Sequence, residues 1–170
     1  MSGDTIRHKV KGEELPEFFK YIREQGAFTD DLVFVCIGTD RSTGDALGPL
    51  VGTMLSEMGY RHVIGTLESP CDASNLLRRL GEIPPGKVTI AIDACLGLPA
   101  SIGYFQVANQ PIHPGKSVGK TLPPVGSYSI AAIVNTAGPK QYWKLQSTSL
   151  YRVISMAKEI AAAVRCEFPV

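Results

Sequence analysis

Two short, nearly uninterrupted apolar runs place the strongest constraint on how this chain can fold. Residues 33–37 (VFVCI), which follow Leu32, end before Gly38, and residues 88–92 (VTIAI) lie between Lys87 and Asp93. Runs of this length without regular polar alternation are typical of strands that are covered on both faces, as in a parallel sheet. Because segments with helical spacing separate and follow these runs, we predict an α/β architecture with a mainly parallel central sheet.

The sequence predicts two amphipathic helices that cover this sheet. Residues 47–58 carry apolar side chains at helical spacing, and Gly59 follows as a common stop residue for helices. Residues 149–165 carry a second apolar stripe, typical of a helix that packs on a sheet. Weaker patterns predict a helix at residues 16–23, a short helix around Leu76, Leu77 and Leu80, and strands at residues 63–67, 104–107 and 127–134. Residues 109–126, dense in proline and glycine, are predicted to form a long loop.

Length and composition favour a single domain, and the pattern of strands and helices favours three α/β/α layers. The chain has 170 residues, of which 44% are hydrophobic, enough for one sizeable core. We expect residues 1–170 to form one domain with its core at about residues 31–165, and residues 1–30 to contribute a peripheral helix.

Charge and cysteine usage exclude several classes of partner. The formal net charge is only +1, so the chain lacks the basic surface expected of a protein that binds nucleic acid or an anionic membrane. No apolar run reaches the about 20 residues that cross a bilayer, and the N-terminus does not resemble a signal peptide, so we expect a cytoplasmic protein. The four cysteines form no CxxC pair, and we predict neither a metal centre nor a cofactor.

Two aspartates are notable because each follows one of the apolar runs. Asp45 comes after a polar, glycine-containing stretch, just before the helix predicted at residues 47–58, and Asp93 follows residues 88–92 directly. In open α/β sheets, ligand-binding groups gather at the carboxyl ends of the strands. We therefore expect both aspartates to lie on loops at one edge of the sheet and to face each other across a cleft.

Each aspartate also has a purely structural interpretation. The Asp45 carboxylate could cap the exposed N–H groups of residues 47 and 48, and an aspartate such as Asp93 often begins the turn after a strand. If the two carboxyls instead approach closely, repulsion raises the pKa of one of them, so that they share a proton while the ionised partner activates water. The same pair could hold a divalent metal. The residues alone leave these alternatives open.

Three segments resemble motifs of the germination protease of spore-forming bacteria, namely residues 44–49 (GDALGP), 91–95 (AIDAC) and 112–119 (IHPGKSVG). That enzyme degrades small acid-soluble spore proteins, and the resemblance places its two essential aspartates on Asp45 and Asp93. Over roughly residues 31–165 the chain is more similar still to the sporulation protein YyaC family. Hydrogenase-maturation endopeptidases are more distantly similar, and they recognise nickel through two acidic residues and a histidine. The chain has positional equivalents of the two acidic residues only.

The resemblance implies a phosphorylase/hydrolase-like fold and an aspartate-dependent endopeptidase of sporulation or germination, with Asp45 and Asp93 as the catalytic pair. It implies a protein or peptide substrate in the cytoplasm, the forespore or the spore core. Substrate-binding residues are expected on the loops around the pair: Thr39, Asp40, Gly44, Ser69, Pro70, His113 and Gly115. Two alternatives stay open, an inactive protein of the same fold that binds a peptide or small ligand, and a metal-assisted maturation peptidase. The sequence also leaves open a homo-oligomer.

Overall fold

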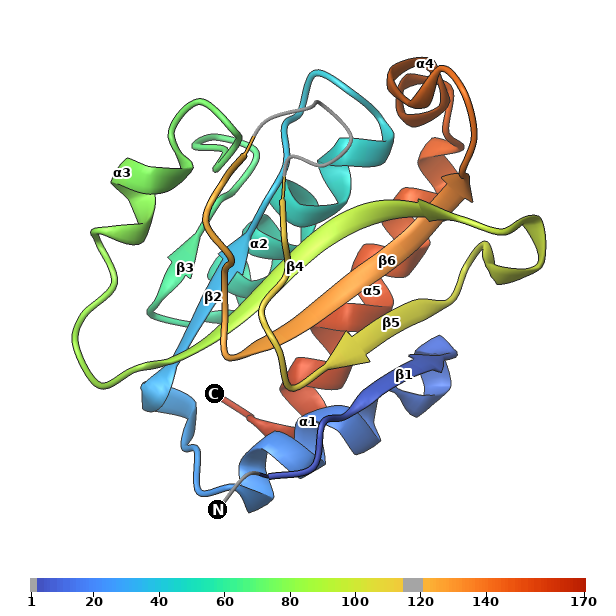
Figure 1. The fold of residues 1–170 in the computed structure, drawn as a ribbon. Coiled ribbons are helices and arrows are strands. Elements are labelled where there is room, and N and C mark those ends of the chain that lie inside the picture. Colours follow the sequence, from blue (N-terminus) through green and yellow to red (C-terminus); the bar gives the residue numbers. More distant parts are fainter. Residues whose placement is uncertain (1–2, 115–120) are drawn as a thin grey trace.

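A computed structural model of the chain describes residues 3–114 and 121–170. Its six strands form one sheet in the order β1-β5-β6-β4-β2-β3 (Figure 1). The strands are β1 (Arg7–Val10), β2 (Leu32–Cys36), β3 (Val63–Ile64), β4 (Val88–Gly97), β5 (Phe105–Ala108) and β6 (Tyr128–Thr136). β2 pairs in parallel with β3 and β4, and β4 pairs in parallel with β6, whereas β5 and β1 join in antiparallel fashion. The prediction of an α/β fold with a mainly parallel sheet is confirmed.

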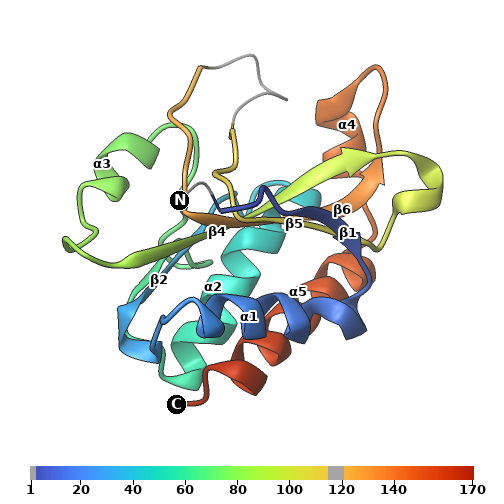
Figure 2. The same cartoon turned by 60° about the horizontal axis from the view of Figure 1, so that its bottom comes forward.

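The two faces of the sheet are covered unequally. α1 (Leu15–Glu24), α2 (Leu47–Met58) and α5 (Leu150–Glu167) lie together on one face (Figure 2). The other face carries the shorter α3 (Leu76–Leu80) and residues 111–114 and 121–125, and α4 (Gln141–Gln146) follows the end of β6. Four 3-10 helices complete the described elements: η1 (Gly12–Glu14), η2 (Thr29–Asp31), η3 (Gly44–Ala46) and η4 (Pro99–Ser101). No helix within residues 3–114 and 121–170 has both the length and the apolar character of a membrane span.

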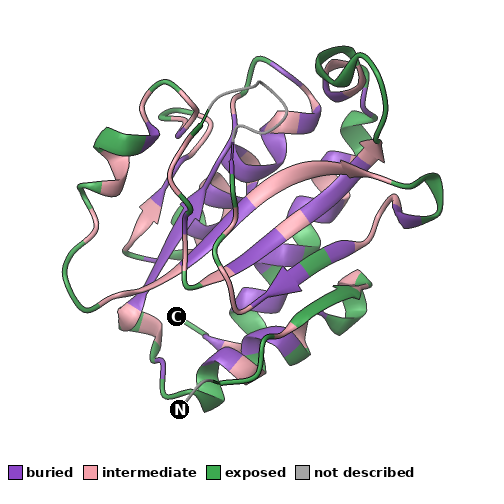
Figure 3. Cartoon of the chain, in the orientation of Figure 1, coloured by how far each residue is buried: buried purple, intermediate pink, exposed green. Residues whose placement is uncertain are grey.

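The uninterrupted apolar run of β2 is explained by cores on both of its faces. Alternate residues, among them Phe34 and Cys36, face the main core between the sheet and α1, α2 and α5. Val33 and Val35 face a smaller apolar cluster that includes Leu76 of α3. All five residues of β2 are therefore buried, as the colouring of Figure 3 shows.

The N-terminal segment is not peripheral, which corrects the prediction for residues 1–30. α1 buries four side chains in the main core, and Phe19 and Ile22 among them are fully buried. α1 packs against α5, and β1 extends the sheet by pairing with β5. The reason is that the apolar stripe of α5 and the sheet behind it need a third helix to exclude water, and α1 supplies it.

Three elements differ from the sequence prediction for local reasons. β3 has only two residues, because Gly65 adopts a left-handed backbone conformation with a φ of +95° and the chain turns there. β1 was not predicted because it is a four-residue strand whose first three residues are exposed and charged or polar, as is usual at a sheet edge. α4 was not predicted because its six residues are too few to establish a helical period.

Candidate active site

Asp45 is held near the carboxyl end of β2 by close backbone packing. The Thr39 N–H donates to the Asp45 carbonyl oxygen at 3.1 Å, and η3, which carries Asp45, packs against β4. A Cβ on Gly38, whose φ is +149°, would clash with that same carbonyl oxygen, and a Cβ on Gly48 would clash with the backbone of Ile37. These two glycines allow the start of α2 to lie directly against the end of β2, and this contact positions Asp45.

The Asp45 carboxyl does not cap a helix, so the capping interpretation is wrong. Neither η3 nor α2 has a side-chain cap hydrogen bond, and the N-cap residue of α2 is Ala46. The Asp45 side chain is half-buried, and this burial raises the pKa of its carboxyl. The nearby Ser42 hydroxyl opposes that rise. Ser42 Oγ is buried and has no hydrogen-bond partner among the described residues, so its contact with the Asp45 carboxyl does not meet the geometry of a hydrogen bond.

Asp93 lies within β4 and not on a loop after the strand, which corrects the sequence prediction. β4 continues to Gly97 because its pairing with β6 extends past Asp93, which lies opposite Ala131. On its other side, β2 ends at Cys36 opposite Ile92, so Asp93 is the first residue of β4 beyond the end of that neighbour. By strand alternation its side chain points away from the main core, toward the face that bears α3.

The two carboxyls are close enough for the charge of one to act on the other. Burial raises the pKa of the Asp93 carboxyl well above its ordinary value, and the negative charge of Asp45 raises it further. The Ala94 N–H opposes these effects by donating to Asp93 Oδ1 at 2.8 Å. The pKa of Asp93 is thus raised by burial and by its neighbour, whereas the pKa of Asp45 is raised by burial and lowered by Ser42.

Two cysteines near Asp93 are held in the thiol form. Burial raises the pKa of Cys95 to about 12, and the charge of Asp93 contributes to this rise. Burial also raises the pKa of Cys71 to about 11. Because the thiolate is the nucleophilic form of cysteine, neither residue is activated for attack at neutral pH. The chemistry that these groups favour is therefore that of the two carboxyls.

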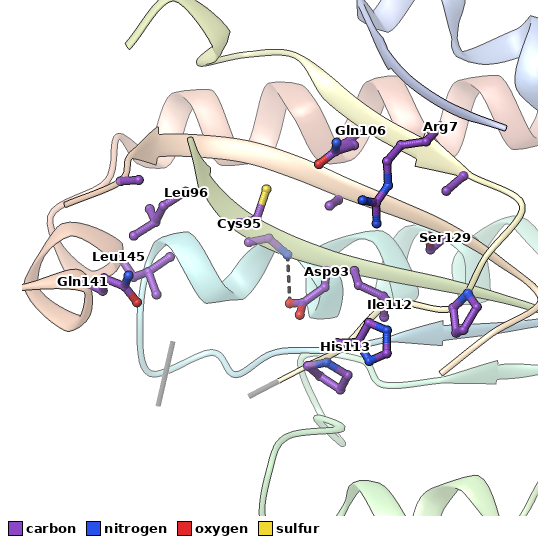
Figure 4. A pocket seen from close by; sticks show the side chains of 16 residues that line it. Arg7, Asp93, Cys95, Leu96, Gln106, Ile112, His113, Ser129, Gln141 and Leu145 are labelled. Atoms are coloured by element: carbon purple, nitrogen blue, oxygen red, sulfur yellow. Dashed lines mark hydrogen bonds between the residues drawn. The ribbon is translucent and has the colours of Figure 1, made fainter. Parts of the chain in front are cut away.

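A cavity of about 490 Å³ lies over the sheet face that carries Asp93 (Figure 4). Its floor is formed by residues that alternation places on this face of β4, β6, β5 and β1: Asp93, Cys95, Ser129, Gln106 and Arg7. Ile112 and His113, from the segment between β5 and β6, also line the cavity, and two backbone hydrogen bonds of 2.9 Å join Ile112 to Val125. Gln141 and Leu145 of α4 line the end of the cavity. The cavity thus places Asp93 within reach of a ligand as long as a short peptide.

Of the residues predicted to bind substrate, His113 lines this cavity together with Asp93. Thr39 is half-buried and does not line the cavity, and its Oγ1 accepts a hydrogen bond from the Arg41 N–H at 3.2 Å. Asp40 is exposed. Gly44 is buried, and a Cβ added to it would lie nearest to Leu145.

The remaining predicted residues are Ser69, Pro70 and Gly115. Ser69 Oγ accepts a hydrogen bond from Arg79 of α3 at 3.0 Å, and the Pro70 carbonyl oxygen accepts one from the Asn75 side chain at 3.0 Å. Neither residue lines the cavity. Gly115 lies outside the described residues. Their roles in substrate binding stay predictions.

The fold and the site together define an α/β protein in which Asp93 lines a cavity and the charge of Asp45 acts on Asp93. Asp45 itself is not among the residues that line the cavity, so the prediction that both aspartates face one cleft is met by Asp93 alone. The chain belongs to the family described as protein of unknown function DUF1256, whose model matches residues 6–163. It is 47% identical over 135 residues to uncharacterized protein YyaC of Bacillus subtilis (strain 168), which confirms the family predicted from the motifs. That alignment covers 76% of this chain and 66% of the relative, so the chain spans slightly less than two thirds of the relative's length.

The chain is similar in structure to the NiFe hydrogenase maturation protease HycI from Thermococcus kodakarensis KOD1. The two chains are 21% identical with a TM-score of 0.47, over 80% of this chain and 93% of that one.

Proposed function

We propose that this protein is an aspartate-dependent hydrolase that cleaves a peptide bond, with Asp45 and Asp93 as its catalytic pair. The observation that carries the proposal is the pair itself. Two carboxyls from different elements interact through their charges, and Asp93 opens into a cavity of about 490 Å³. Strongly raised carboxyl pKa values are typical of groups that transfer protons in catalysis.

The unequal pKa values assign the two carboxyls different roles in the proposed reaction. The ionised Asp45 accepts a proton from a water molecule while the water oxygen bonds to the carbonyl carbon of the scissile peptide. The protonated Asp93 donates its proton to the carbonyl oxygen, which gives a neutral tetrahedral intermediate. When the C–N bond breaks, the proton held by Asp45 passes to the leaving nitrogen and a hydroxyl proton returns to Asp93. No covalent intermediate with the protein is required.

The cavity has the chemical character that a peptide needs. The hydroxyl of Ser129 and the amide of Gln106 are polar and uncharged, so they can pair with peptide N–H and C=O groups. Ile112 and Leu145 supply apolar walls for side chains. These features support a protein or peptide as the substrate.

The biological setting is proposed from the motif resemblance to the germination protease and to sporulation proteins. On that basis the substrate is a protein of the sporulating cell or of the spore, such as a small spore protein, and the enzyme acts in the cytoplasm, forespore or spore core.

A cleavage assay on protein extracted from spores tests the proposal. We expect the wild type to generate new fragments, and Asp45→Asn and Asp93→Asn each to slow cleavage by about 100-fold or more, since each removes a group that transfers a proton. Asp30→Asn is the matched control, because Asp30 is an exposed aspartate in η2 and its substitution should leave the rate unchanged. Fragments identified by mass spectrometry would give the cleavage site.

Two results would contradict the proposal. The first is cleavage by both carboxyl variants at the wild-type rate. The second is the absence of cleavage by the wild type together with tight binding of a spore peptide, which would favour the inactive binding protein instead.

A metal-assisted peptidase is the remaining alternative. Two carboxylates are suitable ligands for a divalent metal, but the parts of the chain that the structure describes contain no group of three or more His, Cys, Asp or Glu placed to hold one. The proposed reaction is written with the two carboxyls alone. Loss of cleavage on treatment with a chelator, and its recovery on adding a divalent metal, would favour this alternative.

A further inference from the structure

Arg7 is a charged group of the cavity that the proposed reaction does not use. It lies on the edge strand β1, and its side chain reaches over the sheet into the cavity (Figure 4). The ion pairs found among the described residues involve Arg23, Arg78 and Arg79, and Arg7 takes part in none of them. A cation that faces a cavity without a protein counter-ion is available to an anionic ligand.

The register of the sheet relates Arg7 to Asp93. Arg7 lies opposite Ala108, Ala108 lies opposite Ser129, and Ser129 lies opposite Ala91, two residues before Asp93 on the same face. β1 and β4 are three strand spacings apart, which at 4.7–4.9 Å each is about 14 Å. An extended peptide advances about 3.3 Å per residue, so roughly four residues span this separation. A single peptide in the cavity can thus contact both groups.

The charges around Arg7 favour an anion. Asp93 is the acidic residue in the lining of the cavity, and its strand is three strand spacings, about 14 Å, from the strand of Arg7. Lys9, on the same face of β1, is held by Ser101 Oγ at 3.1 Å and lies over the Tyr104 ring. The adjoining Gln106 is neutral. The guanidinium of Arg7 can therefore pair with both oxygens of a carboxylate in one plane without competition from a neighbouring acid.

We propose that Arg7 binds a carboxylate of the substrate and thereby selects peptides that carry an acidic side chain or a free C-terminus within about four residues of the scissile bond. The position relative to the scissile bond rests on the proposed function, whereas carboxylate binding at Arg7 rests on the cavity alone.

Binding of short synthetic peptides to the full chain tests this inference. The probes are alanine peptides blocked at both ends, with either one glutamate or one glutamine at the centre, and an alanine peptide with a free C-terminus beside its amidated form. Binding is followed by NMR, with the Arg7 side-chain N–H signal as the reporter. We expect the wild type to bind a carboxylate-bearing peptide about tenfold more tightly than its neutral partner, the gain typical of a charge-assisted hydrogen bond.

Arg7→Gln should reduce this preference to less than about twofold, because it removes the charge and keeps a polar side chain. Arg61→Gln is the matched control, since Arg61 is exposed and lies outside this cavity, and it should keep the full preference. The pair of peptides that shows the larger preference identifies the source of the carboxylate as a side chain or a C-terminus.

An equal preference in wild type and Arg7→Gln, or no preference in the wild type at millimolar peptide, would overturn the inference. Failure of the proposed function has a different outcome. In that case the Arg7-dependent preference is present, but the wild type cleaves nothing in spore extracts. Conversely, cleavage that depends on Asp45 and Asp93 but ignores acidic residues would retain the hydrolase and reject the role of Arg7.

Discussion

At the scale of single residues, the ionisation of Asp93 links the candidate site to the stability of the fold. Its carboxyl is protonated more readily in the folded protein than in an unfolded chain, where the pKa is near 3.8. Below pH 3.8 the Asp93 carboxyl is protonated in both the folded and the unfolded state, so it does not lower the free energy of unfolding. As the pH rises through the higher folded pKa, ionisation occurs at a cost, and the contribution of this residue to stability is lost.

Replacing Asp93 by asparagine should therefore stabilise the protein at neutral pH, and the gain should disappear as the pH is lowered toward 3.8. Urea unfolding of the wild type and Asp93→Asn over this range of pH measures the effect. Asp30→Asn serves as the control, because that aspartate is exposed. A variant that is less stable than the wild type at neutral pH would contradict the burial described for Asp93.

The two aspartates could be found from the sequence because each follows an apolar run. His113 of the cavity could be predicted as well, but the cavity residues on the neighbouring strands could not. Arg7 and Gln106 join the site because β1 and β5 pair beside β6, and such long-range pairing leaves no local pattern in the chain. The position of Asp93 inside β4 has the same origin, because β6 extends the pairing past the end of β2.

At the scale of elements, the contact between the start of α2 and the end of β2 positions Asp45. Gly48 makes this contact possible, because a side chain there would meet the backbone of Ile37. The contact lies at the backbone level, so neither element can relieve a clash by changing a rotamer.

We predict that Gly48→Ala lowers the free energy of unfolding by about 1–3 kcal/mol and slows cleavage, since it displaces η3 together with Asp45. Ser56→Ala, at an exposed position of the same helix, should be nearly neutral. Chemical denaturation and the spore-extract assay measure the two effects. Equal stability of Gly48→Ala and Ser56→Ala would show that the helix tolerates separation from the strand.

The sequence predicted best the strand that is apolar at every position and the helices that are long enough to show a helical apolar stripe. β2 is apolar throughout because both its faces are buried, and α2 and α5 are long enough to show a helical stripe. β1, β3 and α4 have two to six residues each, and tertiary contacts rather than local preferences decide their structure.

At the scale of the whole molecule, the N-terminal segment and the rest of the chain share one core. Phe19 is fully buried in the cluster that also contains residues of α5 and of the central strands. The segment is thus expected to unfold with the rest of the molecule rather than before it.

Phe19→Ala should lower the stability of the whole chain by about 3–5 kcal/mol, the usual cost of removing a buried aromatic side chain. Glu17→Ala, at an exposed position of α1, is the control and should have little effect. Thermal unfolding followed by circular dichroism distinguishes them. A loss similar to that of the control would mean that α1 is peripheral after all.

The central claim is that the fold brings Asp45 and Asp93, 48 positions apart in the sequence, into one coupled pair of carboxyls. The most direct test is an NMR titration of the carbon-13 signal of the Asp93 carboxyl in the wild type and in Asp45→Asn. We predict a pKa for Asp93 above its ordinary value in the wild type, and a lower one in Asp45→Asn, because the negative neighbour is removed. An Asp93 pKa that is the same in both proteins would contradict the account.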